Sequence, residues 1–560
     1  GRQSRGHRFM HAKPVHLADA DSYLDAMRAA KVLADPVERR ARIRTQVQHA
    51  TGADDAPRLT ETLCNEIANL TEWPVAIACA FDRAYLAVPH EALVMTMETN
   101  QKFVPVFDAQ GKLAERFIGV ANIESKDPAQ IRHGYERVIR PRFADAKFFF
   151  DEDLKTPLAS HQQALREVTW HKALGSLWDK TVRVAELARA IANRLRESGI
   201  EVDAALATHA AALSRCDLMT RMVGEFPELQ GVMGRHYAIA QGECTEVADA
   251  LDQFYRPRHA EDGIAGQPLA QVLSIADKLD TLAGIFAIGL KPSGNKDPFA
   301  LRRAALGLAR TLIEGGIDLD LRVWLREALE QVPESAFLHS PAGRGAGGKG
   351  AKLAQSAAPS PDAAREERRR FASPPPEQEG KAVGARRIEL ADELYAFILD
   401  RLRGYYAERG FTPQQFEAVA AIQPASLLDF DRRLRAVAAF ANRPEAEHLA
   451  AANKRVANIL RKEGIDARAA ASRQIDETQL RETAERELWQ ALQVVNSDPA
   501  SDDRDYENRL ARLAQLQTPV DMFFESVLVM AEDVALRTNR IRLLARIKAQ
   551  FDAIADIALL

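Results

Sequence analysis

The chain has 560 residues, with 75 basic and 79 acidic side chains and a net charge of −4. This length exceeds what one hydrophobic core holds and predicts three or four domains. The charge balance excludes attraction of the whole molecule to nucleic acid or anionic lipid, so such binding requires local patches. The four cysteines form no C-x-x-C pair, which favours a reducing, cytoplasmic location. No apolar run of about 18 residues predicts a membrane span.

Strands are expected in the first part of the chain, where short β-rich runs alternate with turn residues. The runs are VAIACAF (75–81), AYLAVP (84–89) and KFVPVFD (102–108). Gly111 stands where a hairpin turn needs a positive φ. A helix is predicted to begin after Asp127, a good N-cap, with Pro128 at its first position.

Helical periodicity dominates from residue 165 to residue 312. One predicted apolar stripe consists of Leu174, Leu177, Val184, Leu187, Ala188 and Ile191. Residues 338–386 are rich in Gly, Pro, Ala, Ser and charge, and they predict a disordered insertion. Within it, GRGAGGKG (343–350) approaches a phosphate-binding loop but ends in Gly and follows no apolar strand, so no nucleotide site is predicted there. From there to the C-terminus the sequence again predicts helices.

The stretch ALSRCDLMTRMVGEFPELQGVMG (212–234) has the outline of a metal-binding His-Asp pair whose His is missing. HD-type phosphohydrolases bind metal through a His, a later His-Asp pair and a final Asp. That spacing places Lys180, Cys216 with Asp217, and Asp277 at these positions. Because both imidazoles are absent and an ammonium repels a cation, we expect a degenerate pocket without metal. Asp217 and Asp277 are expected to pair with Lys180 instead.

An active HD-type phosphohydrolase acting on nucleotides is the alternative function. It would need His209 or His236 to replace the missing ligands, although a lone His on a helix is usually structural or solvated.

Residues 534–559 are predicted to form one helix with an apolar and a basic face. The apolar face consists of Ile541, Leu544, Ile547, Phe551, Ile554 and Ala558. Arg542 and Arg546 lie four residues apart on the opposite face and are expected to face solvent. From this pattern alone, a solvated charged face is the favoured interpretation.

Two further arginines of this helix fall elsewhere on the helical wheel. Arg540 lies on the apolar side and Arg537 at its margin. We expect both to pair with acids such as Asp533, or with carbonyl groups, rather than to contact a ligand.

Eight long segments follow one another as they do in the β subunit of the bacterial glycyl-tRNA synthetase built from two α and two β chains. They are NQKFVPVFDAQGKL, GVANIESKDP, RPRFADAKFFFDEDL, RCDLMTRMVGEFPELQGVMGRHYA, ADKLDTLAGIFAIG, KDPFALRRAALG, AANKRVANIL and VALRTNRIRLL. The whole chain therefore resembles this family, interrupted by the insertion. The resemblance implies partnership with an α subunit that uses ATP and Mg²⁺ to activate glycine. It also implies a second β chain, binding of the tRNA for glycine, and no cofactor or catalytic residue in this chain.

The resemblance further implies a multi-domain, mainly helical architecture. Its expected parts are an α+β domain similar to that of phenylalanyl-tRNA synthetase β chains (1–155), a degenerate HD-like helical domain (160–335), a helical body (387–465) and a DALR-type anticodon-binding domain (466–560). The motif reads VALR here, at 534–537. Because the chain begins at Gly1 without the family's N-terminal portion, an N-terminally truncated fragment is expected.

An anticodon-binding domain needs exposed guanidinium groups for phosphate or base contacts. The resemblance therefore favours Arg542 and Arg546 as tRNA-binding residues. Arg140 and Arg142, in the sequence RPRF, form a second predicted patch, for which packing or loop anchoring is the alternative.

Overall fold

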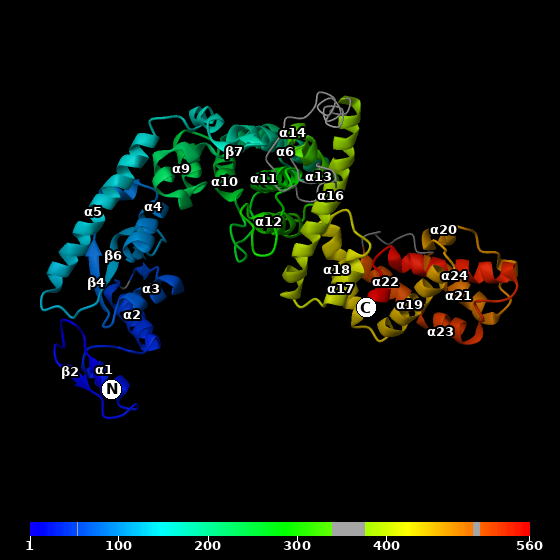
Figure 1. Ribbon diagram of the computed structural model, residues 1–560, viewed down its shortest axis with the longest axis horizontal. Coiled ribbons are helices and arrows are strands. Elements are labelled where there is room, and N and C mark those ends of the chain that lie inside the picture. The colour runs from blue at the N-terminus through cyan, green and yellow to red at the C-terminus, as the bar shows by residue number, and fades with distance from the viewer. Residues whose placement is uncertain (53, 339–375, 497–504) are drawn as a thin grey trace, which may run out of the picture. The chain divides into compact units, whose positions relative to one another are not determined.

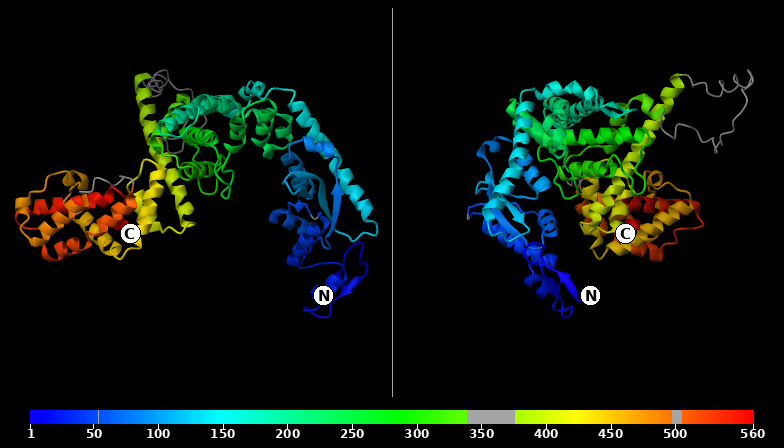
Figure 2. Two further views of the ribbon diagram at one scale, coloured as in Figure 1. Left: turned by 180° about the vertical axis from the view of Figure 1, so that it is seen from behind. Right: turned by 60° about the vertical axis from the view of Figure 1, so that its left-hand side comes forward.

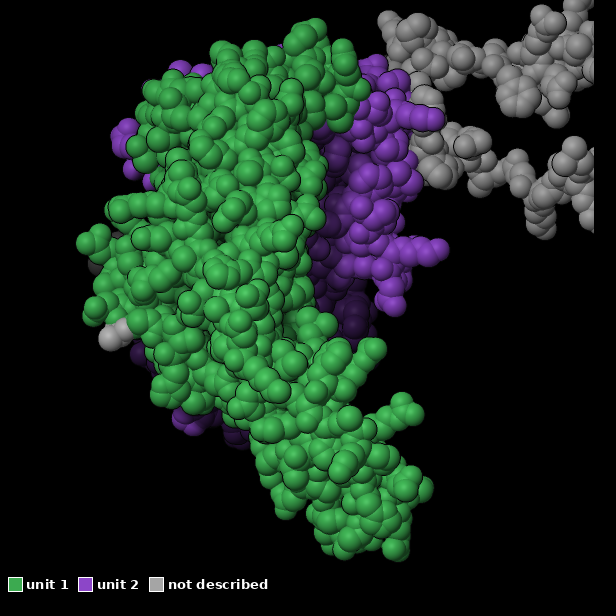
Figure 3. All heavy atoms as spheres, turned by 90° about the vertical axis from the view of Figure 1, so that its left-hand side faces the viewer, with its two compact units in different colours: residues 1–168, 212–252 green, residues 169–211, 253–560 purple. Residues whose placement is uncertain are grey.

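The chain is described here by a computed structural model in which helices predominate, as predicted (Figure 1). The described residues are 1–52, 54–338, 376–496 and 505–560. The chain forms two compact units, which Figure 3 colours separately. The first unit comprises residues 1–168 and 212–252, and the second comprises 169–211 and 253–560. The predicted segment 160–335 contributes to both units, and its boundaries as a domain stay a prediction.

The first unit contains both strands and helices. Its strands are β1 (Gln3–Arg5), β2 (Pro14–His16), β3 (Ala56–Pro57), β4 (Val75–Ala80), β5 (Val104–Phe107) and β6 (Leu113–Ala121). Its helices are α1 (Tyr23–Ala29), α2 (Pro36–Ala50), α3 (Glu61–Leu70), α4 (His90–Met95), α5 (Pro128–Asp153), α8 (Arg221–Glu225) and α9 (Val232–Ala240). Two more helices, α7 (Ala204–Leu213) and α10 (Thr245–Gln253), run across the boundary between the units.

An antiparallel sheet with the order β3-β5-β6-β4 organises the first unit. Successive residues of a strand point to opposite faces. Ile118 of β6 accordingly joins the core formed with α2 and α3. Its neighbour Phe117 stacks on Phe103, which contacts Tyr135 of α5. Helices therefore cover both faces of this sheet, with α5 running past β4 and β6 (Figures 1 and 2).

The strands are partly as predicted. The predictions at 75–81 and 102–108 are confirmed by β4 and β5, and Gly111 has the expected positive φ of 74°. The prediction at 84–89 is wrong, because Arg83–Ala87 forms a 3-10 helix whose first turn is capped by the Asp82 carboxylate. The sequence reading also missed β6, the longest strand of the sheet.

Helix α5 begins as predicted. The Asp127 carboxylate accepts a hydrogen bond from the N–H of Ala129, and Pro128 occupies the first turn, where its missing N–H has no cost. Farther along the helix, Phe143 is fully buried against the rings of Phe81 and Tyr85. These contacts fix α5 on the unit and leave its opposite side exposed.

The second unit is almost entirely helical. Its first elements are β7 (Thr169–His171), β8 (Gly175–Ser176), α6 (Leu177–Glu197), α11 (Pro268–Ala287), α12 (Leu301–Glu314), α13 (Leu321–Glu330) and α14 (Glu334–Leu338). They are followed by α16 (Pro376–Ala407), α17 (Pro413–Ala420), α18 (Leu427–Ala441), α19 (Ala446–Lys462) and α20 (Ala467–Ala471). The last helices are α21 (Thr483–Asn496), α22 (Tyr506–Ala514), α23 (Gln517–Ser526) and α24 (Val534–Asp552). No helix among these described elements is long and apolar enough to cross a membrane.

Helix α11 is the centre of the first half of this unit. Nearly all its residues are buried, and α6, α12, α13 and α16 pack around it. The predicted stripe of α6 is buried at Val184, Leu187, Ala188 and Ile191, as expected. Leu174 precedes the helix, which begins at a capping box formed by Ser176 with Asp179.

The predicted insertion at 338–386 is wrong at its C-terminal end, where residues 376–386 form the first turns of α16. This stretch contains Glu, Lys, Ala and Arg, which favour helix, and the apolar Val383 is buried. Residues 339–375, which include the GRGAGGKG stretch, lie outside the described residues.

The predicted helix at 534–559 ends earlier, at Asp552. The carbonyls of Ala553 and Ile554 accept hydrogen bonds from the Arg433 guanidinium of α18. The N–H of Asp556 donates to the carbonyl of Ala418. Because other helices satisfy these backbone groups, the chain leaves the helix without exposing them. The predicted apolar face is buried at Ile541, Leu544, Ile547, Phe551 and Ile554.

Candidate nucleic-acid interface and buried charge network

Lys180 lies in the second unit, on α6, where it faces carboxylates of α11. Its Nζ atom is 3.1 Å from Asp277 and 2.9 Å from Asp280, and it donates to the Thr281 hydroxyl at 2.7 Å. The ammonium also lies 5.1 Å from the centre of the Trp170 ring. Only 3% of Lys180 is exposed. The structure thus confirms the predicted pairing of Lys180 with Asp277.

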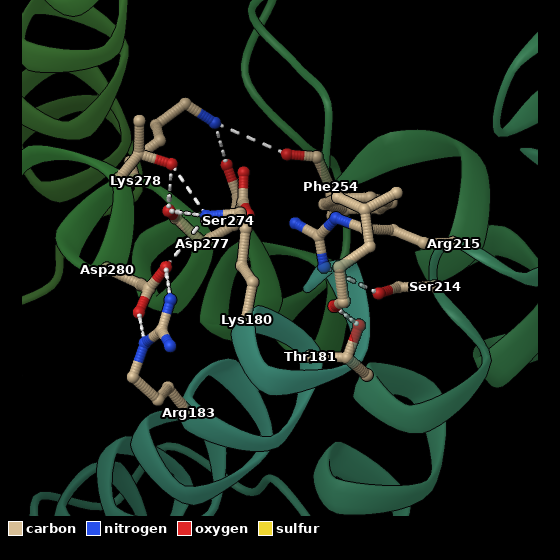
Figure 4. A network of polar contacts seen from close by, with 12 residues as sticks. Lys180, Thr181, Arg183, Ser214, Arg215, Phe254, Ser274, Asp277, Lys278 and Asp280 are labelled. Atoms are coloured by element: carbon tan, nitrogen blue, oxygen red, sulfur yellow. Dashed lines mark hydrogen bonds and ion pairs between the residues drawn. The ribbon is translucent and has the colours of Figure 1, made fainter. Parts of the chain in front are cut away.

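Asp280 is the second anion of this buried network, which Figure 4 shows at close range. It is 2% exposed and accepts hydrogen bonds from Lys180 and from the Arg183 guanidinium. Burial alone would raise the pKa of Asp280, but the charges of Lys180 and Arg183 outweigh it and lower the pKa below its usual value. Asp280 therefore remains ionised between two cations.

The sequence analysis did not single out Asp280 and Arg183, although their spacing from Asp277 and Lys180 indicates them. Lys180 and Arg183 are three residues apart, and so are Asp277 and Asp280. Residues three apart share a helix face, so two facing helices can present paired cations to paired anions. The spacing could have predicted a four-residue network rather than one ion pair.

A third cation, Lys278 of α11, is buried beside this network. Its Nζ donates to the carbonyls of Phe254 and Arg256 at 3.2 and 2.9 Å, and to the Ser274 hydroxyl at 2.6 Å. Burial lowers the pKa of Lys278 to about 8. Three neutral oxygens therefore accept the hydrogen bonds of the Lys278 amino group. Because this group is buried and its donors are used, it is not available to bind an external anion.

Asp217 lies in the first unit, where it caps a helix. Its Oδ2 atom accepts hydrogen bonds from the N–H groups of Gly231 and Gly234, at 2.6 and 3.2 Å, at the start of α9. Burial raises the pKa of Asp217 to about 6, and burial also raises the pKa of the neighbouring Cys216 thiol to about 12. The pair thus consists of a capping carboxyl and an inert buried thiol. The prediction that Asp217 pairs with Lys180 is wrong, because Oδ2 of Asp217 accepts these two N–H groups and Oδ1 has no partner among the described residues.

Neither histidine considered as a replacement ligand completes a metal site in the described structure. His236 lies in the first unit, where Nε2 is 3.0 Å from the Glu91 carboxylate. His209, on α7, is exposed. Among the described residues, no three His, Cys, Asp or Glu side chains form a group able to hold a metal ion.

We expect the purified chain to hold no stoichiometric transition metal at Lys180 and Asp277. The ammonium occupies the position that a cation would take, and its two carboxylate partners already balance the local charge. Elemental analysis for zinc, manganese and iron after dialysis should find far less than one ion per chain. One ion per chain, released when Asp277 is replaced by Ala, would contradict this prediction.

The C-terminal helix α24 is held by a buried ion pair. Arg540, 5% exposed, donates from Nε to the Glu485 carboxylate of α21 at 2.5 Å and from Nη1 to the Leu528 carbonyl at 2.8 Å. The prediction that Arg540 pairs internally is confirmed, but its partner is Glu485. The suggested acid, Asp533, instead caps the first turn of α24 and lies 3.5 Å from Arg481.

Arg542 and Arg546 do not face solvent as predicted, because residues 471–476 lie across that side of α24. Both side chains are half-buried. Arg542 donates to the Gln474 carbonyl at 3.3 Å, and Arg546 donates to the carbonyls of Ala471 and Arg473 at 3.1 and 3.0 Å. Arg546 also lies 5.2 Å from the centre of the Trp489 ring. These arginines therefore hold a chain segment in place, and whether they also contact RNA stays a prediction.

The 471–476 segment is fixed at its other end by Asn539 of α24. The Asn539 side chain accepts from the N–H of Asp476 at 2.9 Å and donates to its carbonyl at 3.0 Å. Asn539 is 2% exposed, so this paired recognition of one backbone unit is shielded from water.

Arg140 and Arg142 lie on the exposed side of α5. Among the described residues, neither side chain makes a hydrogen bond or an ion pair. Arg140 also borders a shallow pocket lined by Asp82, Tyr85 and Glu136. The packing or anchoring alternative therefore has no support from the described contacts, and both guanidinium groups are free to bind a ligand.

Comparison with known proteins first gives the class of the C-terminal part. Residues 449–557, which contain α24 and the 471–476 segment, match the model of the DALR anticodon binding domain. This match assigns the C-terminal part to the class of anticodon-binding domains. Residues 1–421 match the family model of the glycyl-tRNA synthetase beta subunit. The chain belongs to the glycyl-tRNA synthetase β subunit family.

Similar curated proteins agree with this assignment. The glycine–tRNA ligase beta subunit of Xylella fastidiosa strain M12 is 49% identical over 560 residues, covering 100% of this chain and 74% of that protein. The corresponding subunit of Xanthomonas campestris pv. campestris strain 8004 is 48% identical, over 99% of this chain and 73% of that protein. That of Pseudomonas syringae pv. tomato is 43% identical, over 100% and 74%.

Proposed function

We propose that this chain is the tRNA-binding β subunit of a glycine–tRNA ligase, the enzyme that attaches glycine to its tRNA. The match of nearly the whole chain to the β subunit family and to an anticodon-binding domain carries this proposal. The alternative, a metal-dependent phosphohydrolase, has no support. Its ligand positions hold Lys180, which is ion-paired, and Asp217, which caps a helix.

The partners follow from the subunit name of the relatives. We propose that an α subunit carries the catalytic site and uses ATP and Mg²⁺ there, and that this chain holds neither. Assembly with a second β chain and two α chains, in the cytoplasm, belongs to the same proposal.

The RNA-binding residues are proposed from exposure and charge. Arg140 and Arg142 offer two guanidinium groups on the exposed side of α5, suited to the phosphate backbone of RNA. Arg542 remains a candidate because it lines an open pocket. Arg546 is better suited to positioning the 471–476 segment, since two carbonyls and a ring already surround it.

The function can be tested by reconstitution. We expect this chain alone to show neither glycine-dependent ATP–pyrophosphate exchange nor charging of tRNA, because the proposal places the catalytic site on the α subunit. Addition of the cognate α subunit should restore both activities, and this chain alone should retain measurable tRNA binding. Exchange activity in a preparation free of α subunit would contradict the division of labour. Failure to support charging in the complete complex would contradict the proposed function.

A further inference from the structure

A pocket of about 390 Å³ lies between α20 and α24, within the part of the chain that matches the DALR domain. Its volume lies in the range of small-ligand pockets. Three arginines line it, Arg473, Arg537 and Arg542. Its remaining lining combines apolar side chains with two carboxylates: Ile465, Ala469, Ala470, Ile541, Thr538, Glu463 and Asp466.

Two of the three guanidinium groups are available to a ligand. Arg537, the last residue of the VALR motif, is half-buried, and Arg473 is exposed. Within the described part of the chain, neither side chain makes a hydrogen bond, an ion pair or a ring contact. The prediction that Arg537 pairs with an acid or a carbonyl is wrong for the described residues, which include no such partner. No described contact within the protein therefore balances the charge of Arg537.

The backbone around Arg473 is fixed even though its side chain is exposed. Its carbonyl accepts a hydrogen bond from Arg546 at 3.0 Å, and that of the next residue, Gln474, accepts one from Arg542. Arg537, on α24, lies one helical turn before Ile541, whose buried side chain forms part of the pocket wall. The two free arginines thus belong to two different chain segments that line one pocket, and the backbone of each segment is held by hydrogen bonds.

We propose that this pocket binds a single unstacked nucleotide of the bound tRNA. Guanidinium groups bind phosphate bidentately and stack on bases, and apolar walls accept the face of a base. Oδ1 of Asp466 caps α20 by accepting the N–H of Ala469 at 2.7 Å, which leaves Oδ2 and the Glu463 carboxylate to accept hydrogen bonds from ribose hydroxyls or base amino groups. The Glu463 carboxylate would only repel a free anion. The lining therefore suits a nucleotide better than an inorganic anion. This assignment rests on the proposed tRNA-binding function.

The test compares Arg537→Ala and Arg473→Ala with Arg443→Ala in the full chain assembled with its α subunit. Arg443 is exposed and does not line the pocket, so it controls for the loss of one positive charge. Each pocket variant should weaken binding of the tRNA for glycine by about tenfold, the effect typical of one arginine contact to RNA or DNA. The control should bind nearly as well as the unaltered complex.

Two further measurements distinguish the loss of a contact in the pocket from a general loss of charge or stability. Chemical footprinting should show that one nucleotide protected in the unaltered complex becomes reactive in both pocket variants, while protection elsewhere persists. Glycine-dependent ATP–pyrophosphate exchange and the thermal unfolding midpoint should not change. If Arg537→Ala does not fold, the surface variant Arg473→Ala still decides the question.

Several outcomes would overturn the assignment. If both pocket variants bind tRNA like Arg443→Ala, with unchanged footprints, the pocket is not a nucleotide site although the subunit binds tRNA. A uniform loss of protection would indicate a general charge effect, and binding of inorganic phosphate in competition with tRNA would indicate a simple anion site. If the unaltered complex fails to bind tRNA, the proposed function fails and the pocket assignment with it.

Discussion

Replacing Asp280 by Asn should lower the free energy of unfolding by about 3 to 5 kcal/mol, the usual effect of removing one partner from a buried ion pair. The substitution keeps the shape of the side chain but leaves Lys180 and Arg183 with one carboxylate, Asp277, which is itself only partly buried. Both cations are almost completely buried, so water cannot compensate for the lost charge. Urea unfolding followed by circular dichroism measures the difference.

The matched control is Asp392→Asn in the same unit. Asp392 also accepts a hydrogen bond from an arginine, Arg322, at 2.9 Å, but 62% of its side chain is exposed. Exposed pairs of this kind contribute about 0 to 1 kcal/mol. If the two substitutions shifted the unfolding midpoint equally, the network around Lys180 would not have the stabilising role assigned to it.

Replacing Arg540 by Met should destabilise the C-terminal part of the second unit by a similar amount, about 3 to 5 kcal/mol. Met fills much of the same volume, so the main loss is the charge that balances Glu485, none of which is exposed. The Leu528 carbonyl loses its donor as well. Thermal unfolding should show a lower midpoint, whereas Arg189→Met, which removes half of an exposed pair in α6, should leave it nearly unchanged.

A double variant tests the cause of this loss. Glu485→Gln removes the unbalanced charge while its carbonyl oxygen can still accept the N–H of Glu482, which donates to Glu485 at 2.7 Å. The Arg540→Met and Glu485→Gln double variant should therefore be more stable than Arg540→Met alone, by 1 kcal/mol or more on the scale typical of coupled sites. A double variant as unstable as the sum of its single changes would show that lost packing, not charge, explains the effect.

Periodicity and caps predicted the local structure well. The start of α5 followed from Asp127 and Pro128, and the apolar faces of α6 and α24 followed from their spacing. The failures came from groups supplied by distant parts of the chain. The end of α24 depends on Arg433, which lies more than a hundred residues earlier, and no local pattern contains that information.

The candidate site was predicted in type but not in detail. A helical wheel shows which residues of α24 avoid its own apolar stripe, and it placed Arg542 and Arg546 correctly opposite that stripe. It cannot show that the 471–476 segment covers this side and binds both guanidinium groups. A helical wheel also contains no information on contacts with other segments. It therefore did not indicate Arg473, which belongs to the covering segment, or show that Arg537 is unpaired.

The fastening of the 471–476 segment to α24 has a thermodynamic consequence for any ligand of this surface. Ordering a loop or a long side chain at the moment of association costs about 0.5 to 1.5 kcal/mol for each immobilised side chain. Arg546 and Asn539 fix the backbone at both ends of this segment in the free protein. That conformational entropy is therefore lost during folding, and the surface is preorganised before RNA arrives. Loosening the segment should thus accelerate RNA dissociation more than it slows association.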